Sequence, residues 1–86
     1  MVEHIVLAYN LFGGYMDYKR IRDLREDSDL SQAQMGKILV LTQRAYSYYE
    51  NGERTIPVEV LIALARFHKV SVDYILGLTD NKTPYN

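Results

Sequence analysis

The strongest constraint on the fold is a pair of helix start signals that lie close together in the middle of the chain. Ser31 stands three residues before a glutamine, which is the spacing of a capping box. Thr42 is a second N-cap candidate, and Gly52 supplies the left-handed residue that ends the helix after it. We therefore expect two short helices, at residues 32–39 and 43–51, separated by a three-residue break at residues 40–42.

Two short helices with such a break have the spacing of a helix-turn-helix, a unit that suits a reader of double-stranded DNA. The second helix presents its N-terminal residues to the major groove, and the unpaired N–H groups at helix starts can hold phosphate. In that helix Tyr46 and Tyr49 face one way. The opposite side carries residue types that contact base edges: Gln43, Arg44, Ser47 and Tyr48. The alternative is the solvated polar face of any globular helix, which spacing alone does not exclude.

A further helix is expected before this unit. Asp17 is a good N-cap, and the helix after it runs to about Ser28 with Ile21 and Leu24 facing inward.

Two more helices are expected after it. Pro57 stands where a first-turn proline is tolerated, and Ser71 caps a last helix over residues 72–76 that Gly77 closes. The helix that starts at Pro57 is expected to turn an apolar face inward, flanked by Leu64 and made of Val58, Leu61, Ile62 and Ala65. Because residues 16–78 show no alternating strand pattern, we predict an all-α fold, a compact domain of five helices.

Composition limits the class of protein. The 86 residues are 48% apolar and 24% charged, which fits one small domain whose marginal stability favours a dimer. No apolar run approaches the roughly 20 residues of a membrane span. The absence of cysteine excludes disulfides and thiolate metal sites and fits a cytoplasmic location. A net charge of −1 excludes an indiscriminate polyanion binder but permits a local basic patch.

The chain divides into an apolar arm at residues 1–15, the helical domain at 16–78 and a polar tail at 79–86. The arm ends in Gly13-Gly14, and its apolar patch is too large to leave in water without consequence: Ile5, Val6, Leu7, Ala8, Tyr9, Leu11 and Phe12. Two interpretations stay open. Either the arm is strand-like and covers the core or dimerises, or Met16 is the biological start and the glycine codons are a ribosome-binding site.

Residues 31–52 resemble the helix-turn-helix of the phage Cro/repressor (XRE-type) family, from the Ser-Gln start to the Glu-Asn-Gly exit. The similarity extends upstream through residues 22–25 and downstream through residues 61–65 and 70–77. It covers roughly residues 17–79, about three quarters of the chain. The resemblance implies a sequence-specific DNA-binding transcriptional regulator, a repressor that acts as a homodimer on a two-fold operator.

The resemblance also implies roles for single positions. Gln32 would contact phosphate and brace the recognition helix, and Arg25 would pair with Glu50 to tie the first helix to the exit of the third. Two independent surface charges are the alternative, but an unpaired Glu50 near a helix C-terminus is disfavoured by the helix dipole. The base edges would face Gln43, Arg44, Ser47 and Tyr48. Phosphates would be bound by Gln32, Thr42, Asn51 and Arg54.

Three residues depart from the family pattern. Val40 stands at a turn position where glycine is usual, and a β-branched residue at positive φ costs about 1 kcal/mol or more. The turn is therefore either strained or built with a different backbone conformation. Tyr48 replaces a common arginine or lysine, and its ring and hydroxyl could touch a thymine methyl or a phosphate. Lys69 replaces the common glycine or asparagine after the fourth helix.

The charges near the predicted DNA-binding helices call for a dimer. Residues 32–54 carry three basic and two acidic side chains, so a single domain should bind DNA weakly. Two copies on a two-fold axis double the phosphate contacts and place the recognition helices about 34 Å apart. The candidate contact surface, which the family often uses, is Tyr74, Ile75 and Leu78; the alternative is that these residues are core.

No pattern in the sequence points to catalysis. His4 and His68 have no partner at ligand spacing, and we expect His68 to be partly buried. We therefore expect no enzyme, metal site, cofactor, small-molecule ligand or membrane partner; the expected partners are double-stranded DNA and a second copy. Two alternatives remain: an antitoxin or restriction-controller protein of the same fold, and a protein-interaction module that has lost DNA binding, which the acidic balance and Tyr48 favour.

Overall fold

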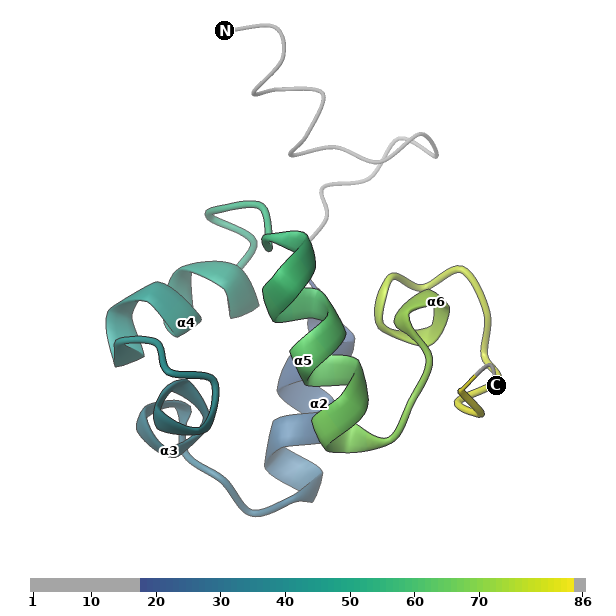
Figure 1. Ribbon diagram of the computed structural model, residues 1–86, viewed down its shortest axis with the longest axis horizontal. Coiled ribbons are helices and arrows are strands. Elements are labelled where there is room, and N and C mark those ends of the chain that lie inside the picture. The colour runs from purple at the N-terminus through teal and green to yellow at the C-terminus, as the bar shows by residue number, and fades with distance from the viewer. Residues whose placement is uncertain (1–17, 85–86) are drawn as a thin grey trace, which may run out of the picture.

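The computed structural model describes residues 18–84, which form five α-helices and no strand (Figure 1). The helices are α2 (Lys19–Asp27), α3 (Gln32–Ile38), α4 (Gln43–Glu50), α5 (Val58–His68) and α6 (Val72–Ile75). The predicted all-α, five-helix domain is confirmed. The predicted arm at residues 1–15 lies outside the described residues, as does Asp17, the predicted first N-cap. The first helix starts later than predicted, because Tyr18 stands at its N-cap position.

The helices are arranged around α2 and α5 (Figure 1). In Figure 1, α3 and α4 lie on one side of this pair and α6 lies on the other. Contacts join α3 to α4, while α6 contacts both α2 and α5. The helix-turn-helix therefore projects from one side of the domain, away from the C-terminal helix.

Local caps set the helix starts as the sequence predicts. The Ser31 hydroxyl accepts the Gln34 N–H at 3.1 Å while the Gln34 side chain accepts the Ser31 N–H at 2.8 Å, which completes the capping box. Thr42 caps α4 and Ser71 caps α6 in the same way. These three helices each end one residue earlier than predicted, because the last predicted residue is the C-cap: Leu39, Asn51 and Leu76.

The core takes one fully buried side chain from each of the first four helices, and these are Ile21, Met35, Tyr46 and Leu64. The predicted inward positions in α2 and the inward face of Tyr46 and Tyr49 are confirmed.

The predicted apolar face of α5 is partly wrong. Leu64 is central rather than flanking, while Val58 and Ile62 are 65% and 40% exposed. Both the observed and the predicted face have helical spacing, so periodicity could not choose between two overlapping stripes.

The turn between α3 and α4 depends on a close backbone approach at Gly36. A Cβ atom there would lie 3.1 Å from the Leu41 carbonyl oxygen and 3.2 Å from that of Thr42. The Gly36 carbonyl accepts the Leu41 N–H at 2.7 Å. Any larger residue would push the turn away from α3, so this glycine sets how closely α4 packs against α3.

Two of the residues that depart from the family pattern, Val40 and Lys69, have a left-handed backbone conformation. Val40 has a φ of 59°, so the turn takes the strained of its two alternatives. The Val40 side chain is 91% exposed, which means that packing offsets little of this cost. Lys69 caps the C-terminus of α5 with a φ of 58°. Its unbranched Cβ makes that conformation less costly than it is for valine.

A buried ion pair ties α2 to the end of α4. Arg25 Nε donates to Glu50 Oε2 at 2.8 Å and Arg25 Nη2 donates to Glu50 Oε1 at 2.9 Å. The third guanidinium nitrogen donates to the Leu30 carbonyl at 2.8 Å, in the loop before α3. Gln32, at the start of α3, donates to Glu50 Oε1 at 3.1 Å. Three helices are thus joined at one carboxylate, whose side chain is 1% exposed.

The hydrogen bonds around the Glu50 carboxylate make the stability of the fold sensitive to pH. Burial acts to raise the pKa of Glu50, but the hydrogen bonds it accepts, with Arg25 the strongest donor, outweigh burial and hold that pKa below its usual value. A carboxyl whose pKa is lower in the folded than in the unfolded chain stabilises the fold at neutral pH. That stabilisation is lost as the pH falls through the folded pKa.

Replacing Val40 with glycine should raise the free energy of unfolding by up to about 1 kcal/mol, because the left-handed strain disappears while glycine loses some backbone entropy. Urea unfolding measures this change. Val40→Ile keeps the β-branch and should match the wild type. A Val40→Gly midpoint at or below that of the wild type would show that the turn is not strained.

Replacing Arg25 with methionine should lower the free energy of unfolding by about 3 kcal/mol at pH 7, because it leaves a buried carboxylate unpaired. The deficit should shrink as the pH falls, since burial then raises the pKa of Glu50 and protonation removes the unpaired charge. Urea titrations between pH 7 and pH 4 measure it. Arg22→Met, at an exposed position of the same helix, is the control. A deficit equal to the control, or independent of pH, contradicts this account.

Candidate nucleic-acid interface

The predicted base-contacting residues gather around one open hollow of about 410 Å³. Gln43 and Arg44, in the first turn of α4, are exposed, whereas Ser47 and Tyr48 one turn later are half-buried. Gln32, from the first turn of α3, completes the lining. The starts of both helices therefore border the same concave surface, which is the arrangement that brings helix N–H groups toward a phosphate backbone.

Tyr48 contacts two arginines at this surface. Its hydroxyl accepts a hydrogen bond from Arg44 Nε at 2.8 Å, and the Arg54 guanidinium lies over its ring, 4.5 Å from the centroid. The Arg44 guanidinium is 5.6 Å from the same centroid. One tyrosine thus contacts an arginine of α4 and an arginine of the following loop, and favourable cation–π contact holds the second of these near α4.

The residues predicted to bind phosphate differ in how their side chains are used. The Gln32 amide donates to Glu50, so this side chain braces the end of α4. The Thr42 hydroxyl accepts the Ala45 N–H as the cap of α4. The Asn51 amide nitrogen lies 3.3 Å from Ser47 Oγ and donates to it, which keeps Asn51 beside the polar face of α4.

The three residues predicted to form the dimer contact lie in different environments. Ile75 is 2% exposed and belongs to the core, so it offers no surface to a partner, and its assignment to an interface is corrected. Tyr74 is half-buried, with the Arg20 guanidinium 4.2 Å from its ring centroid. Leu78 is exposed. An apolar residue in the last helix is equally consistent with core and interface, so sequence alone does not separate the two.

The ion pair changes the charge balance of the DNA-binding unit. Counted along residues 32–54, Lys37, Arg44 and Arg54 oppose Glu50 and Glu53, an excess of one positive charge. Glu50 is neutralised from outside this stretch by the guanidinium of α2. When Glu50 is left out, three cations of residues 32–54 oppose one carboxylate, Glu53. This stretch then has an excess of two positive charges, on a chain whose net charge is −1.

Sequence reasoning missed two parts of this site. A glycine in the middle of a seven-residue helix lowers helix propensity, and that cost was the available signal for the close approach at Gly36. The spacing of Arg44 and Tyr48, four residues apart on one helix, was the available signal for their hydrogen bond.

Residues 18–84 contain no group of three or more histidine, cysteine, aspartate or glutamate side chains that could hold a metal ion. Within that stretch no helix has the length and apolar character needed to cross a bilayer. His68 is half-buried, as predicted, and burial lowers the pKa of its imidazole.

Comparison with known proteins gives three similarities. Residues 21–75 match the family model described as helix-turn-helix. Over 66 residues the chain is 39% identical to the uncharacterized HTH-type transcriptional regulator YobD of Bacillus subtilis (strain 168), a match that covers 77% of this chain and 59% of YobD. The chain therefore matches less than two thirds of that relative's length. The crystal structure of the P22 c2 repressor protein in complex with synthetic operator 9T is similar with a TM-score of 0.65 and 33% identity, over 71% of this chain and 92% of the repressor chain.

The family match covers more than half of the chain and includes the parts of the site described above. It contains the whole of α3, α4 and α5, both partners of the buried ion pair and every residue around the hollow. The chain belongs to the helix-turn-helix family of the Cro/C1 (XRE) type, whose members are DNA-binding transcriptional regulators.

Proposed function

We propose that this chain binds a two-fold symmetric operator as a homodimer and represses transcription by occupying it. The observation that carries the proposal is the exposure of Gln43 and Arg44 in the first turn of α4, beside a hollow that the start of α3 also borders. A helix with its N-terminal turn open and its opposite face buried can enter the major groove. The P22 c2 repressor, which is similar in fold, is in complex with an operator.

The side chains at the hollow have complementary partners on base edges. The Gln43 amide can pair bidentately with adenine, and Ser47 can donate or accept. Arg44 uses Nε to bond the Tyr48 hydroxyl, which leaves its two terminal nitrogens directed along one edge of the guanidinium. That edge matches O6 and N7 of guanine. We infer that Tyr48 acts by positioning Arg44 rather than by contacting a base itself.

Phosphate contacts support both affinity and the dimer. Arg54, held over the Tyr48 ring, and the N–H groups at the starts of α3 and α4 are the groups proposed to bind phosphate. Each phosphate that the protein neutralises adds about 0.9 to the slope with which log K falls against log salt concentration. One domain has few cations to neutralise phosphates, so a single domain should bind DNA weakly. Two domains about 34 Å apart, one DNA turn, double that contribution. The exposed Leu78 and the half-buried Tyr74 are the proposed dimer contacts that remain available.

Replacing Arg44 with alanine should relax selectivity at one base position per half-site by about 1–3 kcal/mol, because a bidentate contact to guanine is lost. The measurement is binding to an operator selected from random duplexes and to its single-base variants. Lys37→Ala, an exposed cation of α3 outside the hollow, is the control and should leave base selectivity unchanged. An equal loss on every duplex for Arg44→Ala would make Arg44 a phosphate contact and not a base contact.

Replacing Tyr48 with phenylalanine should reproduce part of the selectivity loss of Arg44→Ala at the same base pair, because the hydroxyl that orients Arg44 is gone while the ring under Arg54 stays. Tyr48→Leu removes the ring as well and should add a loss common to all duplexes. The same set of operator variants measures both. Selectivity lost at a different base pair in Tyr48→Phe would mean that Tyr48 contacts that base directly.

A further inference from the structure

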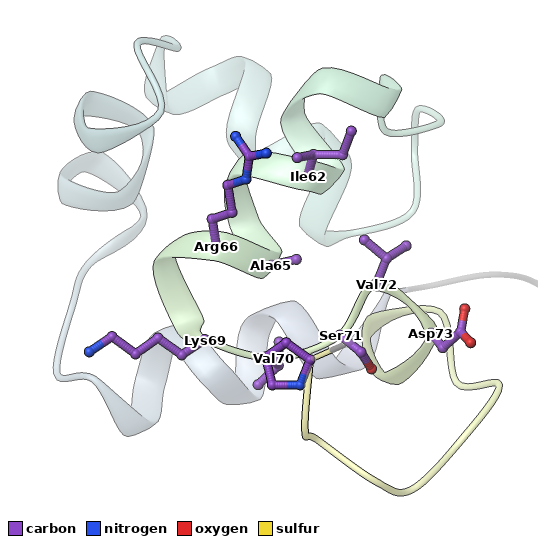
Figure 2. Close-up of a pocket in the computed structure, with 9 residues that line it drawn as sticks. Ile62, Ala65, Arg66, Lys69, Val70, Ser71, Val72 and Asp73 are labelled. Atoms are coloured by element: carbon purple, nitrogen blue, oxygen red, sulfur yellow. The ribbon is translucent and has the colours of Figure 1, made fainter. Parts of the chain in front are cut away.

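A second hollow, of about 460 Å³, lies away from the proposed DNA-binding surface, between α5 and the start of α6. In Figure 2, Ile62 and Ala65 of α5 and Val72 of α6 surround it. Val70 and Pro84 add to its apolar lining. Ile62 therefore stands exposed at the rim of an apolar groove, in a domain too small to leave much apolar surface in water.

The polar residues around this groove are mainly cationic. Arg66 and Lys69, both exposed, line it together with Asp73. A segment that fits it would have apolar side chains, would lack cations and would carry negative charge. Residues 1–15 have this composition: they are rich in apolar side chains, contain Glu3 as their one acid and have neither lysine nor arginine.

We propose that the apolar residues 5–12 occupy the groove between α5 and α6 of their own chain. The occupant is a segment outside the described residues, and the groove supplies an apolar floor with a cationic rim. Burial of the segment hides apolar surface on both partners, which is the driving force for the contact. The groove lies away from α4, because α4 and α6 lie on opposite sides of α2 and α5, so the proposal does not depend on DNA contact by α4 (Figure 1).

The start of α2 lies near one wall of the groove. Arg20, in the first turn of α2, donates to the Tyr74 carbonyl at 2.8 Å, so α2 begins beside α6. Val72, at the start of α6, lines the groove. Residues 13–17 can span up to about 17 Å when extended, and Gly13-Gly14 permits the chain to change direction. The proposal therefore places the segment on its own chain and not on a second copy.

A double-mutant cycle in the full-length chain tests the proposal. One change is Ile62→Glu in the groove, and the other replaces four apolar residues of the segment with serine: Ile5, Leu7, Leu11 and Phe12. In the otherwise unchanged chain, Ile62→Glu should lower the equilibrium constant for folding about tenfold, because it expels the segment. In the serine variant the same change should lower it less than about twofold. Urea unfolding measures all four proteins.

Val58→Glu is the matched control, because Val58 is an exposed apolar residue of α5 that does not line the groove. Its effect should be the same with either segment. Chymotrypsin cleavage after Tyr9 and Phe12 should be slow in the unchanged chain and fast in Ile62→Glu. An Ile62→Glu effect that does not depend on the segment overturns the proposal. A dependence that grows with protein concentration also overturns it, since the groove would then hold the segment of a second copy.

Discussion

The buried ion pair between Arg25 and Glu50 is the contact on which the orientation of α4 depends, because it fixes the end of α4 to α2 while Gln32 fixes it to α3. A carboxylate almost wholly removed from water needs such donors, and their geometry leaves few alternative positions for the helix. Tyr46 packs the same helix into the core, one turn earlier. With its C-terminal half held in this way, α4 can leave its first turn open to a ligand.

The same contact explains how a chain of slightly acidic composition can present a cationic surface. Arg25 of α2 neutralises Glu50 inside the domain, so the balance of charge on α3, α4 and the following loop becomes more positive without a further lysine or arginine there. Tyr48 then orients the Arg44 guanidinium through a hydrogen bond and holds the Arg54 guanidinium beside α4 through a ring contact, despite the mutual repulsion of the two cations. An aromatic residue at this position therefore orients the neighbouring cations, and an acidic net charge does not by itself favour a module that only binds proteins.

Features of the fold that depend on neighbouring residues could be predicted from the sequence, and features that depend on distant ones could not. Ser31 and Thr42 cap helices through bonds that close within three residues, so their pattern suffices. The inward face of α5 is decided by the elements packed against it, such as α6, and so Leu64 is buried where Ile62 was expected to be. The burial of Ile75 is of the same kind. The resemblance to the family, not the spacing, supplied the pairing of α2 with the end of α4, because those partners are far apart in sequence.

The most direct test of the account is the selection of sequences from a randomised duplex library by the full-length chain, repeated at two salt concentrations. The account predicts enrichment of a sequence with two related half-sites about one helical turn apart, bound by two chains and more weakly at higher salt. Enrichment should be lost when Gln43 and Arg44 are both replaced by alanine. Binding without any preferred sequence, or no binding at all, would contradict the claim that the open first turn of α4 enters the major groove.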